Sequence, residues 1–164
     1  ILVRKIYVDF KYVDNYLKQN MLTLLKETYE GKCSKEGYVK NNSINIITHS
    51  SGVIHGNKLA FDVSFECLIC HPVENMKIKC LVKNVTRAGI RAVYYKEEEN
   101  PIVMFIAREN NLKNEEFNKV KENDEIITKV IGIRYKLNDE HISIIGELSS
   151  IKKNKRKTTK KNVK

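Results

Sequence analysis

Residues 59–70 read LAFDVSFECLIC, residues 71–75 read HPVEN and residues 76–95 read MKIKCLVKNVTRAGIRAVYY. Every second residue of the first run is apolar: Phe61, Val63, Phe65, Cys67 and Ile69. Such alternation is typical of a half-buried strand. Pro72 cannot donate a backbone hydrogen bond to a sheet, so we expect the strand to end there. A second alternating run starts at Met76, breaks at a polar turn and resumes at Ile90. The stretch therefore predicts two small β-rich modules that meet at Pro72.

The residues before this stretch predict a helix packed on a small antiparallel sheet. Residues 3–10 read as a strand that puts three apolar side chains on one face: Ile6, Val8 and Phe10. Asp14 or Asn15 is a candidate cap for a helix that runs to about Tyr29, because apolar residues then recur every three or four positions. Gly31 follows as the left-handed residue that ends it.

A second strand is expected over residues 41–48, with Ile44 and Ile46 facing inward. Together with the strand at 59–70, this gives a β-α-β-β module. The loop at 50–58 is polar but has an apolar centre, Val53-Ile54. Two interpretations stay open for these two side chains: they contact a partner protein, or they fold back onto the sheet.

The residues after Pro72 predict a five-stranded barrel. The expected strands cover residues 76–84, 89–95, 101–107, 125–135 and 141–148. A polar stretch at 108–124 separates the third from the fourth, with Leu112 and Phe117 as apolar anchors. This is the outline of an OB-fold. Gly89 is expected at a bulge or sharp coil at the barrel corner, Gly132 at a similar bend or at a close backbone approach, and Asn138-Asp139 at the last turn.

The sequence therefore predicts an α+β protein of three parts. Residues 1–72 form the β-α-β-β domain, residues 73–151 form the OB barrel, and residues 152–164 form a disordered basic tail. The tail contains seven Lys, one Arg and no acidic residue. Removing these eight charges from the net charge of +10 leaves +2 for residues 1–151. The tail is thus a separate polybasic segment, which either contacts nucleic acid or an acidic partner, acts as a nuclear-localisation signal, or only aids solubility.

No catalytic motif is present. The four histidines at 49, 55, 71 and 141 are scattered, and the acidic run at 97–99 is expected to be a solvated loop. The sequence Cys67-Leu68-Ile69-Cys70-His71 has the spacing of a haem attachment site or half a zinc site. On a strand, however, Cys67 and Cys70 face opposite sides. We expect buried reduced cysteines, no metal and no cofactor, and a metal or haem protein stays a minor alternative.

Basic and aromatic residues on the barrel strands are candidates for a single-stranded nucleic-acid surface, which combines cations with stacking rings. These candidates are Lys79, Lys83, Arg87, Arg91, Tyr94, Tyr95, Arg108, Lys129 and Arg134. If Ile90 faces the core, Arg91 and Tyr95 lie outside as a cation and a stacking ring. The alternative is an ordinary charged barrel surface. No run of about 18 apolar residues is present, so no membrane-spanning helix is expected.

Taken in order, several segments resemble the stalk subunit of multisubunit RNA polymerases, the family that includes the seventh subunit of eukaryotic polymerase II and its archaeal E-type counterpart. The matching segments read YEGKC (29–33), GYV (37–39), FDVSF (61–65), CHP (70–72), VTRAGI (85–90) and NPIVMFI (100–106). The resemblance runs from about Val3 to Leu148. It departs at Asn100, where the family has Gly, and at Ile90, where barrels of the S1 type carry an aromatic residue.

The resemblance implies a non-catalytic subunit that docks on the polymerase core through its N-terminal tip domain. Its S1-like barrel then binds emerging single-stranded RNA or initiation factors during transcription. The docking loop then comprises Gly52, Val53, Ile54, His55 and Gly56. The implied partners are the core subunits and a stalk partner of the eukaryotic fourth-subunit or archaeal F type. The implied location is the nucleus, or a viral factory or virion for a viral protein, as a soluble subunit. The alternative is a free-standing RNA-binding protein of translation or RNA decay.

Overall fold

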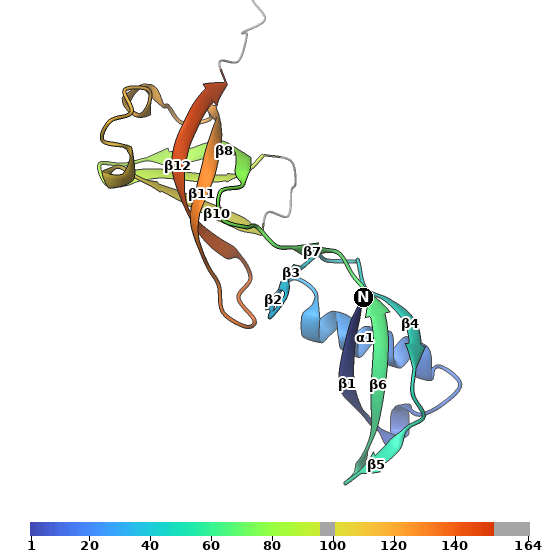
Figure 1. The fold of residues 1–164 in the computed structure, drawn as a ribbon. Coiled ribbons are helices and arrows are strands. Elements are labelled where there is room, and N and C mark those ends of the chain that lie inside the picture. The colour runs from blue at the N-terminus through green and yellow to red at the C-terminus, as the bar shows by residue number, and fades with distance from the viewer. Residues whose placement is uncertain (96–100, 153–164) are drawn as a thin grey trace, which may run out of the picture. The chain divides into compact units, whose positions relative to one another are not determined.

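The structure is a computed structural model that describes residues 1–95 and 101–152. The acidic run at 97–99, Asn100 and nearly all of the basic tail lie outside the described residues. The chain divides into two compact units (Figure 1). One comprises residues 1–71 and 135–141, and the other comprises residues 72–134 and the residues from 142 onward. The described part is mostly β, with one α-helix and a closed five-stranded barrel, which confirms the α+β class.

The first unit is built on the central strand β6 (Lys58–Glu66). Strand β1 (Leu2–Asp9) pairs antiparallel with one edge of β6, while β4 (Asn45–His49) and β5 (Val53–His55) follow one another along the other edge. Helix α1 (Leu17–Tyr29) packs on this sheet. The core between them consists of Ile6, Val8, Met21, Leu25, Val39, Ile44, Ile46, Phe61, Val63 and Phe65. The inward positions expected at Ile44 and Ile46, and at Phe61, Val63 and Phe65 on β6, are thus confirmed.

Two expectations for the N-terminal segment are wrong. Phe10 does not continue the first strand, because β1 ends at Asp9, opposite the first residue of β6. Phe10 instead begins a short 3-10 turn, η1 (Phe10–Tyr12). The side chain of Asp14 does not cap α1; its Oδ1 accepts a hydrogen bond from the backbone N–H of Tyr16, before the helix begins. Gly31 has φ +72° after the helix, as expected.

The run at 59–70 is not one strand. Strand β6 ends at Glu66, which is opposite the first residue of β4, so no neighbouring strand remains to extend the pairing. Ile69 and Cys70 form a separate strand, β7, in a second small sheet with β2 (Cys33–Ser34) and β3 (Gly37–Val39). Ile69 therefore does not share the face of Phe61, whereas Cys67 packs partly buried against the main core.

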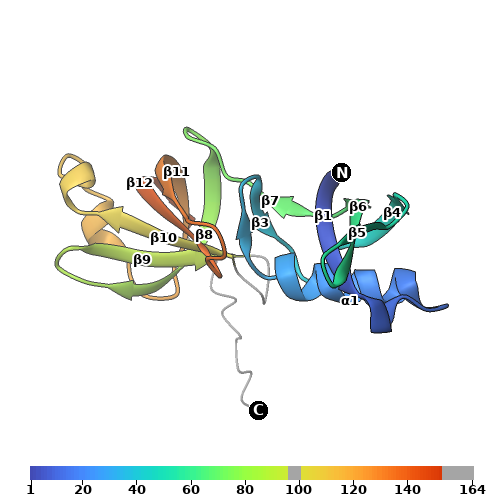
Figure 2. The same ribbon diagram turned by 90° about the horizontal axis from the view of Figure 1, so that it is seen from below.

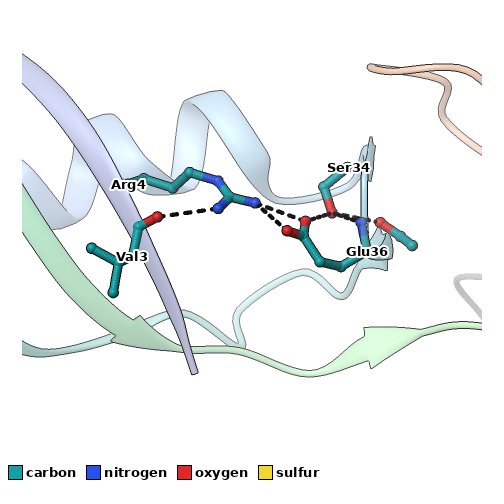
Figure 3. Close-up of polar contacts among 5 residues, drawn as sticks. Val3, Arg4, Ser34 and Glu36 are labelled. Atoms are coloured by element: carbon teal, nitrogen blue, oxygen red, sulfur yellow. Dashed lines mark hydrogen bonds and ion pairs between the residues drawn. The ribbon is translucent and has the colours of Figure 1, made fainter.

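An ion pair connects β1 to the turn of the small sheet (Figure 3). Nη2 of Arg4 lies 2.7 Å from both carboxylate oxygens of Glu36. The buried Ser34 hydroxyl donates to Glu36 Oε2 at 3.0 Å, and it accepts from the Glu36 backbone N–H at 3.2 Å. These hydrogen bonds, first of all the one from Arg4, lower the pKa of Glu36 below its ordinary value. A carboxylate held in this way fixes the turn between β2 and β3.

The turn at 135–141 belongs to the first unit and continues its small sheet. The backbone N–H of Cys33 donates to the carbonyl of Asp139 at 2.7 Å, and the N–H of Asn138 donates to the carbonyl of Cys33 at 2.8 Å. Asn138 has φ +69°, a left-handed conformation that Asn tolerates better than most residues. The expected turn at Asn138-Asp139 is therefore confirmed.

The second unit is a closed barrel whose strands follow the order β10-β12-β11-β8-β9 (Figures 1 and 2). The strands are β8 (Lys77–Val85), β9 (Gly89–Tyr94), β10 (Ile102–Ala107), β11 (Glu125–Arg134) and β12 (Ile142–Lys152). Each overlaps a strand expected from the sequence. All pairs are antiparallel except β10 with β12. Alternate residues of all five strands fill the interior, which removes most of their apolar surface from water.

The connection between β10 and β11 contains two 3-10 turns, η2 (Glu109–Asn111) and η3 (Phe117–Lys119). Phe117 is buried, as expected of an anchor, but Leu112 is exposed, so that expectation is wrong. The buried Asn111 takes its place. Its amide donates to the carbonyl of Ala107 at 2.8 Å, and its side-chain oxygen accepts from the backbone N–H of Leu148 at 2.9 Å.

The two barrel glycines expected at special positions serve different purposes. A Cβ on Gly89 would lie 2.4 Å from the carbonyl oxygen of Ile106 and 2.9 Å from the ring of Phe105, so this glycine permits close strand approach. Gly132 lies at a register shift between β11 and β12, and a Cβ there would meet nothing within 4 Å. It marks a bulge, not a close approach.

Candidate functional site

The outer surface of the barrel carries a row of paired residues that crosses four strands. Arg91 on β9 lies opposite Phe105 on β10, and Phe105 lies opposite Ile145 on β12. Ile145 in turn lies opposite Gly132 on β11. Directly paired residues point to the same side of a sheet, so these four share one face.

A second row lies beside the first. It consists of Leu81, Val93, Val103, Ser143 and Arg134, paired in this order across β8, β9, β10, β12 and β11. We call the two rows together the barrel face. Its centre is apolar, and it carries an arginine on β9 in one row and an arginine on β11 in the other.

The barrel face has the chemistry of a binding surface. Phe105 is 40% exposed and Ile145 is 49% exposed, although each lies in the middle of a sheet of paired strands. Arg91 and Arg134 are exposed, and neither forms an ion pair with any residue between 1 and 95 or 101 and 152. One exposed ring beside cations that have no ion pair among the described residues is a combination found on surfaces that bind single-stranded nucleic acid.

Two other candidates, Lys79 and Tyr95, contact each other beside this face, because they lie two residues along the chain from Leu81 and Val93 and point to the same side of the sheet. The Nζ of Lys79 lies 3.8 Å from the centre of the Tyr95 ring and 2.7 Å from Glu125 Oε2. Glu125 is buried, and the hydrogen bond from Tyr95 to its carboxylate raises the pKa of the Tyr95 hydroxyl. The charge of Lys79 is thus compensated within the protein, which weakens its attraction for a phosphate.

The Arg108 side chain stabilises the connection between β10 and β11 through its hydrogen bonds. Its Nε donates to the carbonyl of Arg87 and its Nη1 to Asn118 Oδ1, both at 2.8 Å. Its guanidinium also lies 5.1 Å from the centre of the Phe117 ring. Arg87 and Lys83 are exposed, on or beside the turn between β8 and β9.

Lys129 lies on β11 opposite Lys77 on one side and Glu147 on the other. The sequence candidates thus fall into separate groups, and the barrel face brings together only Arg91 and Arg134 among them. Phe105 and Ile145 were missed by the sequence reasoning. Residues 101–107, PIVMFIA, are all apolar, so no alternation in the sequence shows that Phe105 faces outward between the buried Met104 and Ile106.

The expected docking loop forms a tight hairpin. Val53 and Ile54 belong to β5 and are 67% and 72% exposed, so the interpretation that they fold back onto the sheet is wrong. Gly56 has φ +63° at the first position of the two-residue turn, where a type II′ hairpin requires glycine. A Cβ on Gly52 would lie 2.7 Å from the Phe61 ring, and the His55 ring lies 5.2 Å from that of Tyr7.

The four cysteines are free thiols. Burial raises the pKa of Cys33 to about 11 and that of Cys80 to about 12, so both are protonated at neutral pH. Burial also raises the pKa of Cys67. Over residues 1–95 and 101–152, no three His, Cys, Asp or Glu side chains are grouped to hold a metal ion. The same residues contain no helix that is long and apolar enough to cross a membrane.

Comparison with known proteins adds one finding. No family model matches the chain. The chain is similar to a protein of Acanthamoeba polyphaga mimivirus whose name is "putative DNA-directed RNA polymerase subunit". The two are 28% identical over 153 residues, which cover 83% of this chain and 71% of the relative. A match of this extent takes in residues from both units.

Proposed function

We propose that this chain is an accessory subunit of a DNA-directed RNA polymerase. The single observation that carries this proposal is the similarity to the mimivirus polymerase subunit along most of the chain. The relative also favours a viral or nuclear setting. We further propose that the subunit is non-catalytic and of the stalk type, with the N-terminal unit docking on the polymerase core and the barrel binding single-stranded RNA.

The strand order of the barrel supports an OB-fold of the S1-like kind. Numbered along the chain from β8, the order is 1-2-3-5-4 with the fourth strand closing on the first, and only the third and fifth strands run parallel. OB-folds bind oligonucleotides on the face of their second and third strands. Here those strands are β9 and β10, which supply Arg91 and Phe105.

In this proposal, each residue of the barrel face has a distinct task. The Phe105 ring stacks on a base, which is sequence-tolerant because every base has a flat face. Arg91 and Arg134 attract phosphates, and the aliphatic residues between them exclude water. Binding of this kind holds a transcript without reading its sequence, which suits a subunit that must handle every RNA the enzyme makes.

Docking on the core is assigned to the hairpin at 52–56. Val53 and Ile54 are large aliphatic residues that the N-terminal unit leaves in water. Their burial against a second protein is worth about 1.5–3 kcal/mol for each side chain that becomes fully covered. A stalk partner of the fourth-subunit or F type is the second expected protein contact.

The test is co-purification from the native source with a tagged chain. We expect the large polymerase subunits to be recovered with the wild-type chain and to be lost with the double variant Val53→Ser/Ile54→Ser. Leu112→Ser is the matched control, because Leu112 is also an exposed aliphatic residue but belongs to the other unit. Recovery of ribosomes or RNA-decay proteins without polymerase would instead establish the free-standing RNA-binding alternative.

A further inference from the structure

Two lysines lie directly opposite each other on neighbouring barrel strands. Lys77 is the first residue of β8, and its partner across the sheet is Lys129 on β11. Like charges placed directly opposite each other destabilise a pair of strands. Neither lysine forms an ion pair with a residue that the structure describes. Glu147 lies on the other side of Lys129, on β12, and so does not stand between the two lysines. The pair therefore attracts an anion.

An aromatic ring lies beside this pair. The backbone N–H of Tyr95 donates to the carbonyl of Lys79, so Tyr95 is the neighbour of Lys79 across the sheet. Lys79 follows Lys77 by two residues on β8, and side chains two apart on a strand point to the same side. At about 4.8 Å between strands and about 3.4 Å per residue, the backbones of Tyr95, Lys77 and Lys129 lie within about 12 Å of one another. We call these three residues the second contact surface.

The Tyr95 ring is held in place by its neighbours. Its hydroxyl donates a hydrogen bond to the carboxylate of Glu125, which raises the pKa of the hydroxyl, so the hydroxyl stays protonated at neutral pH. The ammonium of Lys79 lies 3.8 Å from the centre of the ring and 2.7 Å from Glu125 Oε2. Tyr95 nevertheless remains 43% exposed. The hydroxyl and one face of the ring are thus occupied, and the other face is what Tyr95 offers to a ligand.

The second contact surface continues the barrel face along β9. Val93, which lies two residues before Tyr95, belongs to the second row of the barrel face. Arg91, which lies opposite Phe105, comes two residues earlier still. Four residues separate Arg91 from Tyr95, which corresponds to about 14 Å along the strand. One single strand of the length that an OB-fold covers, about 4–16 nucleotides, reaches from Phe105 to Tyr95.

The chemistry of this surface favours RNA over a segment of protein. A tyrosine whose hydroxyl is already engaged recognises a flat group and not a hydrogen-bonding group, and every base has a flat face. Two lysines without an ion pair suit a phosphate backbone, because each phosphate that they neutralise releases counterions. An acidic peptide would also satisfy the lysines, but its carboxylates would leave the open face of the ring in water.

We propose that single-stranded RNA bound on the barrel face continues onto the second contact surface, where one base stacks on the Tyr95 ring and a phosphate lies between Lys77 and Lys129. Lys79 and Glu125 hold the ring and are assigned no RNA contact. This inference rests on the proposed function. It adds a second stacking position to that function, and it adds Lys77, which the sequence analysis did not single out.

The test of the ring is the affinity of the full chain for a labelled oligouridine of about 12 nucleotides, within the range of one OB-fold, by fluorescence anisotropy. Tyr95→Leu removes the ring but keeps an apolar side chain, and it should weaken binding about 5- to 150-fold. Tyr95→Phe keeps the ring and should retain most of the affinity. Thermal unfolding monitors the folding of both variants.

The test of the lysines is the dependence of the same affinity on salt. Lys77→Gln/Lys129→Gln should reduce the slope of log affinity against log salt by about 0.7 for each phosphate that the pair neutralises. Lys113→Gln/Lys119→Gln is the matched control, because it removes the same charge from two exposed lysines on the connection between β10 and β11. The control should leave the slope unchanged.

The outcomes separate this inference from the proposed function. If the wild-type chain binds no oligonucleotide, the RNA-binding part of the proposed function and the inference both fail. If Phe105→Ala weakens binding but Tyr95→Leu does not, or if the Lys77/Lys129 variant changes the slope no more than its control, the inference is overturned and the proposed function stands. Equal losses for Tyr95→Phe and Tyr95→Leu would also overturn it, since stacking needs only the ring.

A further outcome identifies the alternative occupant. If Lys77→Gln/Lys129→Gln keeps its affinity for RNA but loses a polymerase protein in the native co-purification described above, the lysines serve an acidic protein segment. That result overturns the inference.

Discussion

Phe105 faces solvent although its two neighbours in sequence, Met104 and Ile106, are fully buried. Its ring lies over Gly89, whose missing side chain leaves the space. The pairing register then puts Arg91 on one side of the ring and Ile145 on the other. In the proposed function, this outward aromatic residue on β10 is the stacking ring of the barrel face, and the role that the sequence suggested for Tyr95 stays a prediction.

We expect Phe105→Ala to weaken binding of a single-stranded RNA oligonucleotide about 5- to 150-fold, since removing one stacking contact costs roughly 1–3 kcal/mol. Fluorescence anisotropy at fixed salt measures the affinity. Leu112→Ala, which removes an exposed side chain away from the face, should leave the affinity unchanged. Equal affinities for the wild-type and Phe105→Ala proteins would show that RNA does not stack on this ring.

A pair of glycines in the barrel gives a stability prediction. Gly89→Ala forces a Cβ against the Ile106 carbonyl and should lower the free energy of unfolding by about 1–3 kcal/mol, as overpacking does. Gly132→Ala enters open space and should change it by about 0.5 kcal/mol or less. Urea unfolding of the two variants makes the comparison. Similar midpoints for both would mean that β9 and β10 do not approach as closely as described.

At the scale of elements, the ion pair between Arg4 and Glu36 connects β1 to the turn between β2 and β3. No pattern in the sequence pointed to this pair, because its members are 32 positions apart. Both side chains are partly exposed, so the interaction stabilises the fold by about 1 kcal/mol or less. It adds a side-chain link between β1 and the β2–β3 turn to the backbone hydrogen bonds that already hold β2.

The stabilisation from Glu36 depends on pH in a defined direction. Its pKa is lowered in the folded protein from the ordinary value of 4.5, so its contribution is fully present above that value and is lost as the pH falls through the folded-state pKa. Glu36→Gln should therefore unfold more easily than wild type at pH 7, and the difference should shrink as the pH falls below 4.5. Denaturant unfolding at a series of pH values measures this. Glu115→Gln is the exposed control, and a difference that persists in acid would contradict the ion-pair origin.

The sequence also did not predict the contacts of the connection between β10 and β11. The sequence suggested Arg108 as an RNA contact and Leu112 as an anchor. In the structure, Arg108 bonds the Arg87 carbonyl and Asn118, and buried Asn111 anchors the segment. A basic residue in a barrel protein thus has two possible tasks, and only its hydrogen-bond partners distinguish them.

At the scale of the whole molecule, RNA binding by the basic tail remains a prediction, because nearly all of the tail lies outside the described residues. Seven Lys and Arg residues lie in 153–164, beyond the end of β12 at Lys152. If the tail binds RNA, truncation after Lys152 should reduce the slope of log affinity against log salt by about 0.7 for each phosphate that the tail neutralises. Anisotropy titrations at several salt concentrations measure the slope. An unchanged slope would leave RNA binding to the barrel alone.

The sequence predicted the positions of the barrel strands well, because most of them alternate apolar and polar residues, while β10 is a short apolar run that reads IVMFIA. It failed at strand ends. Phe10 and Ile69 continue an alternating pattern, yet neither lies in the strand that the pattern suggests. A strand extends only as far as the strands that pair with it. Residues 59–70 do not show where the paired strand β4 begins, and so they do not show where β6 ends.

Local order along the chain was enough to predict most of the side chains that leave water, since alternation and helical spacing are local patterns, although Phe10 and Leu112 are exposed. The α+β class, the barrel strands and the apolar Val53-Ile54 pair therefore followed from the sequence. Only the tertiary structure decides which outward-facing residues lie next to one another. Pairing register joins Arg91, Phe105 and Ile145 from three strands, and it puts Asp9 opposite Lys58 at the base of the hairpin. These sites depend on contacts between distant segments, which no local pattern contains.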